Sequence, residues 1–167
     1  MPVARGFLFS GLHCGIKPFK KDLALVASEA PCAAAAVLTQ NRAQAAPVQD
    51  VARRLPASGI RAVLVNSGNA NALTGPEGLE DVSALCAATA KALDVAPAAV
   101  LMASTGVIGQ RLPCAKIVDA LPRLKAQLKA APESAAEAIL TTDTTLKVAS
   151  RTVRLGRKEG RITAICK

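Results

Sequence analysis

The stretch "GIRAVLVNSGNANALTG", residues 59–75, changes character in its middle. Its first half is a run of small aliphatic residues, which is typical of a buried strand. Its second half, residues 66–75, holds three asparagines, two glycines, a serine and a threonine. Asn and Gly adopt left-handed backbone conformations readily, and an Asn side chain can bond its own main chain. We therefore predict a buried strand that ends in a tightly self-bonded polar loop beside a site.

A helix is predicted after this loop, over residues 77–94, and Pro97 marks its exit. One face of that helix carries Val82, Leu85, Cys86, Thr89 and Leu93. The apolar stretch "PAAVLMASTG", residues 97–106, is then predicted to be a strand that stops at a second polar, glycine-bearing turn. Residues 114–129 are helical in pattern, and we expect Pro122 to divide them into two short helices.

Two β-like segments open the sequence, "ARGFLFSG" at residues 4–11 and "KDLALVAS" at residues 21–28. A third, "CAAAAVLTQN" at residues 32–41, is a run of small residues that fits a strand buried on both faces. "PESAAEAIL", residues 132–140, is predicted to be a helix.

The tail is predicted to be a β-hairpin, with strands at residues 152–155 and 161–165 and a turn at residues 156–160. Strands and helices therefore alternate, and we expect one domain, residues 1–167, of the α/β (α+β) class with mixed sheets and packed helices. Glycine-containing loops at the ends of its strands are the natural place for a site.

The composition bounds the function classes. Hydrophobic residues make up 51% of the sequence but aromatic residues only 2%, so the core must consist of many small contacts, and a partner chain could complete it. Five cysteines without CxxC spacing disfavour a disulfide framework and a zinc site, and predict free, mostly buried thiols in a reducing compartment. No segment resembles a cleaved signal or reaches transmembrane length, so we expect a cytoplasmic protein with no membrane partner.

The net charge of +9 is concentrated near the end of the sequence. Such a charge leaves open a basic module that binds nucleic acid. However, Trp and Tyr are absent, and no helix-turn-helix or glycine-aromatic signature is present. A solvated basic face is therefore the preferred interpretation, with no nucleic-acid partner.

The residues that could act as nucleophile and base form no convincing set. His13 is the only histidine and Cys14 follows it directly, but adjacent side chains point apart in an extended chain. No HExxH, P-loop or GxGxxG motif is present, so we predict no metal and no bound cofactor.

Two polar segments remain. Hydroxyls and glycine N–H groups in "STGVIGQ", residues 104–110, could form an oxyanion hole, although a turn that caps a helix is the commoner use of such residues. "TTDTTLK", residues 141–147, could bind a polar ligand or cap a helix. Lys167 could pair with a substrate carboxylate or be an exposed lysine.

Five blocks in this order resemble the ornithine acetyltransferase (glutamate N-acetyltransferase, ArgJ) family over residues 5–167. They are "GIKPFKKDLALVAS", "TQNRAQAAPV", "NSGNANALTG", "LMASTGVIGQRLP" and "AEAILTTDT". The resemblance implies a DmpA/ArgJ-like fold in which a self-cleaved precursor yields an α chain, represented here, and a β chain that completes it. It also implies an αβ hetero-oligomer, a heterotetramer α2β2 or larger.

The resemblance implies a ping-pong reaction through an acetyl-enzyme. Acetyl passes from N-acetylornithine to an N-terminal threonine of the β chain and then to glutamate, releasing ornithine and N-acetylglutamate. Acetyl-CoA is a second donor in some members. An amidase or aminopeptidase with a similar self-generated nucleophile is the alternative within enzymes.

Residue by residue, Thr105 and Gly106 match the oxyanion-hole pair of the family. Thr141 matches a substrate-binding threonine, with Thr142 in its place if the alignment shifts by one, and Lys167 matches a substrate-contacting lysine. Leu73 stands where the family usually has cysteine, a change expected to affect packing more than function. The glycine-rich segment and the catalytic threonine would follow Lys167, so we expect the nucleophile on the β chain and the 167 residues alone to be inactive.

Overall fold

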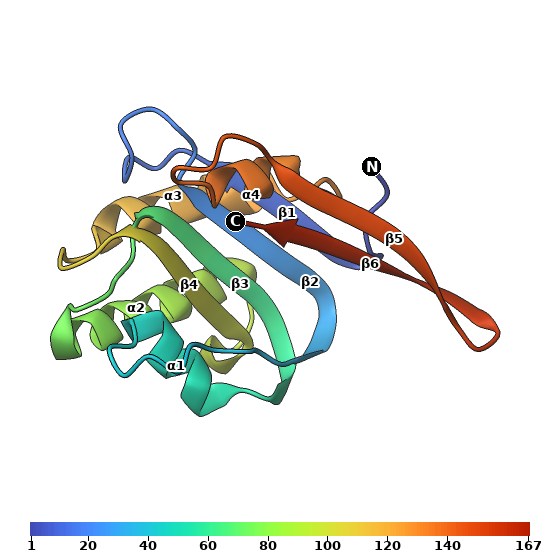
Figure 1. Ribbon diagram of the computed structural model, residues 1–167, viewed down its shortest axis with the longest axis horizontal. Coiled ribbons are helices and arrows are strands. Elements are labelled where there is room, and N and C mark those ends of the chain that lie inside the picture. The colour runs from blue at the N-terminus through green and yellow to red at the C-terminus, as the bar shows by residue number, and fades with distance from the viewer.

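A computed structural model describes residues 1–167 and contains a four-stranded sheet, a two-stranded hairpin and helices on both sides of the sheet (Figure 1). The sheet strands, in spatial order, are β1 (Phe7–Leu12), β2 (Leu23–Ala34), β3 (Ala57–Asn69) and β4 (Val100–Val107). The helices are α1 (Ala46–Arg54), α2 (Gly75–Leu93), the 3-10 turn η1 (Pro97–Ala99), α3 (Cys114–Ala126) and α4 (Glu133–Ala138). The hairpin is β5 (Lys147–Leu155) and β6 (Lys158–Cys166). This mixed arrangement confirms the predicted α+β class.

β3 pairs with a strand on each side, antiparallel with β2 and parallel with β4. Two parallel strands must be joined by a crossover connection, and α2 lies in the connection from β3 to β4. This helix confirms the one predicted over residues 77–94. Alternate residues of β3 point to the same face, and on that face Ala62 and Leu64 are buried in the cluster that α2 and α3 form with the sheet. The largest apolar cluster, which includes Leu25, Leu85, Met102, Ile117 and Leu124, joins α2 and α3 to the sheet.

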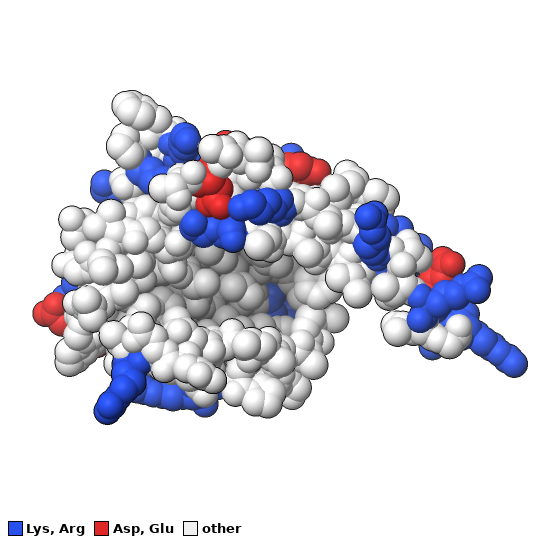
Figure 2. Space-filling model, viewed as in Figure 1, with Lys and Arg blue, Asp and Glu red and all other residues white.

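The opposite face of the sheet is covered only in part. α4 packs on β1 so closely that a Cβ on Gly11 would lie 2.0 Å from the carbonyl oxygen of Ser134, which explains the glycine. A second cluster of Phe9, Ala24, Ala135, Ala138 and Ile139 forms there. The remainder of this face is open: Figure 2 shows it hollowed, and the hollow has a volume of about 440 Å³.

Three predicted elements differ from the structure. Residues 32–41 form no third strand, because residues 32–34 complete β2 and the rest is irregular and mostly exposed. Pro122 does not divide α3, which is continuous. Its ring faces solvent while Ile117, Leu121 and Leu124 are buried on the other side, so packing outweighs the hydrogen bond that proline removes. The hairpin turn is Gly156–Arg157, not residues 156–160, because Leu155 pairs with Lys158.

α1 was not predicted from the sequence. It begins with a proline in its first turn, where the missing N–H needs no partner. The five cysteines are free, as predicted, but only Cys86 is buried, so the expectation that most would be buried was wrong. No helix in the structure combines the length and the apolar character needed to cross a membrane.

Candidate functional site

The two polar segments that follow apolar strands meet at one edge of the sheet. Because β3 and β4 are parallel, their carboxyl ends lie side by side, and Ser67 pairs with Thr105 while Gly68 pairs with Gly106. The register therefore joins "NSGNANALTG" to "STGVIGQ". Thr105 is half-buried and Gly106 is exposed, so both are open to a ligand at this edge.

Gly106 occupies a position that only glycine can fill. Its φ is +138°, and a Cβ there would lie 2.3 Å from the carbonyl carbon of Gly68 and 2.5 Å from the nitrogen of Asn69. Side chains are excluded by both the backbone conformation and the space. The main chain of β4 thus stays bare at the residue after Thr105.

The buried side-chain amides of Asn66 and Asn69 hold the Thr105–Gly106 edge in place. Asn66 is fully buried and donates from Nδ2 to the carbonyl of Asn69 (2.8 Å), while its Oδ1 accepts from the Ser104 hydroxyl (2.6 Å). Asn69 donates from Nδ2 to the carbonyls of Gln110 (3.1 Å) and Arg111 (3.2 Å). The predicted self-bonded loop is confirmed, although its first four residues, 66–69, belong to β3.

The end of the polar loop is tied to α2. Asn71 donates to the carbonyl of Gly78 (2.9 Å) and accepts from the Thr74 hydroxyl (2.7 Å). Arg111 binds both carboxylate oxygens of Asp81, at 2.8 and 3.0 Å, and one oxygen of Glu77 at 2.9 Å. These bonds clamp the segment after β4 onto the first turns of α2.

A second group of predicted residues gathers around Asp143. Its carboxylate accepts from Lys147 (2.8 Å), from Lys167 (3.0 Å) and from the backbone N–H of Thr141 (3.4 Å). The hydrogen bonds from Lys147 and then Lys167 hold the pKa of Asp143 well below its usual range. The structure thus brings Thr141 and Lys167 together, while the exposed Thr142 makes no side-chain hydrogen bond.

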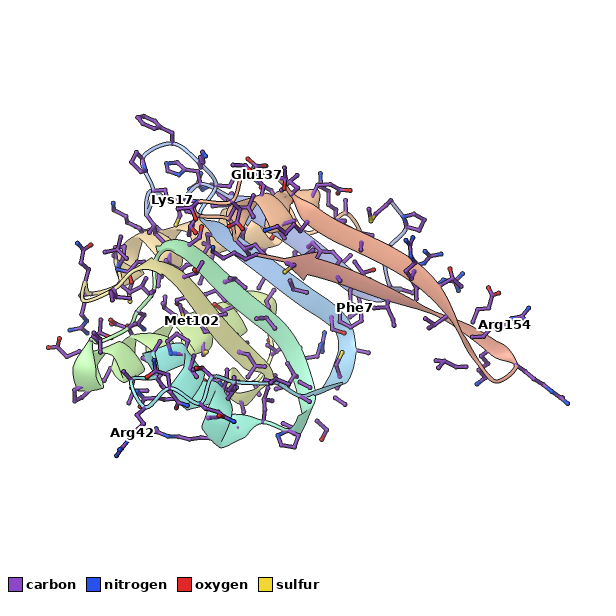
Figure 3. All side chains as sticks on the ribbon, in the orientation of Figure 1. Phe7, Lys17, Arg42, Met102, Glu137 and Arg154 are labelled. Carbon is purple, nitrogen blue, oxygen red and sulfur yellow. The ribbon has the colours of Figure 1, made fainter.

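Two side chains connect the Thr141 segment to the Thr105 edge. The Ser67 hydroxyl donates to the carbonyl of Ala138 at the end of α4. Lys17, in the loop between β1 and β2, donates to the carbonyl of Leu140 (2.9 Å), and Figure 3 shows it at the same end of the molecule as Glu137 of α4. Lys17 was not among the predicted site residues, because its contact with Leu140 depends on the tertiary fold. Asp143 lies in the segment 141–147 that could bind a polar ligand, but its bond to Lys167 was not predicted.

The loop that carries Lys17 is wrapped around the buried carboxylate of Asp22. That carboxylate accepts the backbone N–H groups of Cys14 (2.7 Å), Gly15 (3.2 Å), Ile16 (2.8 Å) and Lys17 (2.9 Å). Burial alone would raise the pKa of Asp22, but the N–H groups, led by those of Cys14 and Lys17, outweigh it and lower the pKa.

His13 and Cys14 serve this loop and form no catalytic pair. His13 Nδ1 lies 3.1 Å from Asp22 and 2.9 Å from the carbonyl of Lys20, and since both neighbours are acceptors, Nδ1 carries a proton. Burial, with a further contribution from Asp22, raises the pKa of the Cys14 thiol to about 12. A thiol that stays protonated is a poor nucleophile. No group of three or more His, Cys, Asp or Glu side chains gathers in the structure to bind a metal ion.

The open hollow reaches the candidate edge. Its lining is almost wholly aliphatic, contributed by residues 32–36, by α1 and by the exposed side of β2, β3 and β4. Ser104, the residue before Thr105, is one of the few polar residues that line it. The edge with Thr105 and Gly106 is therefore continuous with an uncovered apolar surface.

Known proteins match this chain over nearly its whole length. A model of the ArgJ family matches residues 8–167. This chain is 44% identical to the arginine biosynthesis bifunctional protein ArgJ of Thermotoga neapolitana and 47% identical to that of Chlorobaculum tepidum. The alignments cover 100% and 97% of this chain but only 43% and 41% of those proteins. The chain thus spans less than half the length of these relatives.

Solved structures support the fold directly. The crystal structure of the arginine biosynthesis bifunctional protein ArgJ from Bacillus halodurans superposes with a TM-score of 0.92 at 36% identity, covering 99% of this chain and 89% of that one. Ornithine acetyltransferase from Mycobacterium tuberculosis, solved with ornithine, gives a TM-score of 0.91 at 35% identity, covering 98% and 88%.

Proposed function

The chain belongs to the ArgJ family, and from this premise we propose that it is part of an acetyltransferase of arginine biosynthesis that moves acetyl from N-acetylornithine to glutamate. The observation that carries the proposal is the pairing of Gly68 with Gly106, which places the half-buried Thr105 beside a bare glycine backbone at one edge of the sheet. Such an edge suits a reaction in which a carbonyl oxygen becomes anionic.

In this proposal Thr105 and Gly106 form the oxyanion hole. When a nucleophile attacks the acetyl carbonyl carbon, the carbonyl oxygen takes up the negative charge, and the Thr105 hydroxyl and the Gly106 N–H donate to it. Preorganised donors of this kind each lower the barrier by about 3 kcal/mol. The buried Asn66, which bonds the Ser104 hydroxyl and the carbonyl of Asn69, holds the edge in place for that purpose.

The nucleophile in this proposal is an N-terminal threonine of a β chain, so it lies outside the 167 residues. Its hydroxyl oxygen bonds to the acetyl carbon, and the bond from that carbon to the ornithine nitrogen breaks as the nitrogen takes a proton. The ester that results is then attacked by the amine of glutamate, which releases N-acetylglutamate and restores the hydroxyl. Acetyl-CoA would serve as a second donor at the same position.

Thr141 and Lys167 are the proposed substrate contacts, with Thr142 beside them. Both amino-acid substrates carry a carboxylate, which an ammonium group can bind. Asp143 takes one hydrogen bond from Lys167, and an ammonium group has three N–H donors, so donors remain for a ligand. Asp143 thereby orients Lys167 and leaves the other N–H donors of its ammonium free for a ligand.

The apolar hollow is the surface that we assign to the β chain. The relatives are more than twice as long as this chain, and exposed apolar surfaces of this kind mark protein interfaces. An αβ unit that assembles into α2β2 or a larger oligomer would cover the hollow and bring the nucleophile to Thr105. The cytoplasmic location stays a prediction from the sequence.

The test is an assay on the full-length polypeptide that contains this chain. With labelled N-acetylornithine and glutamate, we expect labelled N-acetylglutamate and free ornithine. Release of acetate regardless of glutamate would instead identify an amidase, and retention on heparin that falls steeply with salt, without acetyl transfer, would identify a nucleic-acid-binding module. Intact mass and N-terminal sequencing should reveal a second chain that begins with threonine.

A further inference from the structure

Lys17 makes contacts in three directions, and each is with a group that shapes the candidate site. Its backbone N–H donates to Asp22 (2.9 Å). Its ammonium donates to the carbonyl of Leu140 (2.9 Å). The Cγ of its side chain lies 2.8 Å from the position that a Cβ on Gly68 would occupy. The side chain therefore runs from a buried anchor, past Gly68, to the residue that precedes Thr141.

The anchor of Lys17 is rigid because Asp22 is fully buried and accepts four consecutive backbone N–H groups, those of residues 14–17. Hydrogen bonds to a buried charged group are stronger than those between neutral groups. The origin of the Lys17 side chain is thus fixed relative to β2, which in turn pairs with β3.

The far end of Lys17 binds a carbonyl that has no partner of its own in a helix. α4 ends at Ala138, so the carbonyl of Leu140 lies beyond the helix and takes part in no helical hydrogen bond. Lys17 satisfies the carbonyl of Leu140, directly before Thr141. Lys17 is half-buried, and this burial lowers the pKa of its ammonium.

The middle of the side chain lies against the site edge. The backbone of Gly68 contacts Gly106, and the aliphatic part of the Lys17 side chain packs on Gly68. Any residue larger than glycine at position 68 would collide with Lys17. One side chain therefore spans the distance between the Thr105–Gly106 edge and the Thr141 segment.

We propose that Lys17 is a positioning residue that sets the place of Thr141 relative to Thr105 and Gly106. The inference rests on the proposed function, since it assigns to Thr141 a substrate contact and to Thr105 and Gly106 the oxyanion hole. Lys17 acts through Thr141 and does not itself touch the reacting atoms.

The test compares Lys17→Met with Lys20→Met in the full-length protein. Lys20 lies on the same loop, is exposed, and its ammonium makes no hydrogen bond or ion pair, so it controls for the lost charge. For Lys17→Met we expect the KM for N-acetylornithine to rise about tenfold with kcat within about threefold, because uniform binding is lost while the oxyanion donors stay in place. Lys17→Arg should restore most of the affinity, since a guanidinium can donate to the Leu140 carbonyl.

Hydrogen exchange provides a readout that needs no activity. The amides of Leu140 and Thr141 are bonded to Glu137 and Asp143, and we expect both to exchange faster in Lys17→Met but not in Lys20→Met. Unchanged exchange of these amides in Lys17→Met would overturn the inference, whether or not the wild-type protein transfers acetyl. A wild-type protein that transfers no acetyl would refute the proposed function separately. An unchanged KM, an equal KM change in Lys20→Met, or a fall in kcat at constant KM would also overturn it.

Discussion

Gly68 and Gly106 approach each other so closely that a Cβ on Gly106 would lie 2.3 Å from the carbonyl carbon of Gly68. Real side chains do not make contacts that short. This contact joins two motifs that are far apart in the sequence, and it places the bare backbone of β4 at the proposed oxyanion hole.

The first prediction concerns this glycine contact. Gly106→Ala should lower the free energy of unfolding by about 3 kcal/mol, because overpacking adds to the strain of a positive φ. Gly109 is the matched control, since its φ is also positive (+75°) but nothing lies within 4 Å of the added Cβ. Gly109→Ala should lose only about 1 kcal/mol in urea unfolding of the full-length protein. Equal losses in the two variants would refute the close approach.

The second prediction concerns the buried amide of Asn66. Asn66→Ala should destabilise the protein by about 3 kcal/mol, because the buried carbonyl of Asn69 and the Ser104 hydroxyl lose their partner. The exposed Asn41 is the control, and Asn41→Ala should change the unfolding free energy by about 0.5 kcal/mol or less. A loss at position 66 no larger than the loss at position 41 would show that the amide network does not hold the edge.

The third prediction is a pH dependence that arises from Asp22. The backbone N–H groups lower its pKa in the folded protein, so its contribution to stability is present above the pKa of about 4 in the unfolded chain and is lost as the pH falls through the lower folded value. Asp22→Asn should therefore be about 3 kcal/mol less stable than wild type near neutral pH, and the difference should shrink in acid.

The exposed Asp119 is the control for Asp22. In the same urea titrations, Asp119→Asn should keep the wild-type stability near neutral pH, where Asp22→Asn should show its largest loss. A difference between wild type and Asp22→Asn that stays constant from neutral pH into acid would contradict the charged hydrogen-bond arrangement.

The fourth prediction concerns Asp143. Asp143→Asn removes the charge that orients Lys167, and we expect the KM for glutamate to rise about fivefold as the ammonium loses its fixed place. Lys147→Met is the control because it removes the other partner of Asp143 and leaves the bond to Lys167. A lower KM in Asp143→Asn would mean that Asp143 competes with the substrate carboxylate instead of positioning Lys167.

Elements with clear periodicity could be predicted from the sequence. The apolar residues on one face of α2 and the aliphatic run of β3 indicate directly which residues are buried, so the sequence predicts both elements. α1 was not found because only its first two residues are buried, and its remaining residues are mostly polar or partly exposed. Pro122 shows the opposite error. Proline usually breaks a helix, but the packing of α3, which only the folded structure reveals, keeps this helix continuous.

The site was predictable in its parts but not in its connections. "STGVIGQ" and "TTDTTLK" stand out by composition, and the family resemblance gave Thr105, Gly106, Thr141 and Lys167 their proposed roles. The pairing of Gly68 with Gly106 depends on strand register, which spacing along the chain does not determine. Lys17 acts on Leu140 from 123 residues away, so no local pattern could have indicated it.

The central claim is that Thr105 stabilises the oxyanion of an acetyl transfer, and kcat of Thr105→Ala measures this most directly. In the full-length protein, with N-acetylornithine and glutamate, we predict that kcat falls about 100-fold with little change in KM, whereas Thr105→Ser, which keeps the hydroxyl, stays within about tenfold of wild type. A Thr105→Ala variant whose kcat remains within about threefold of wild type would contradict the account.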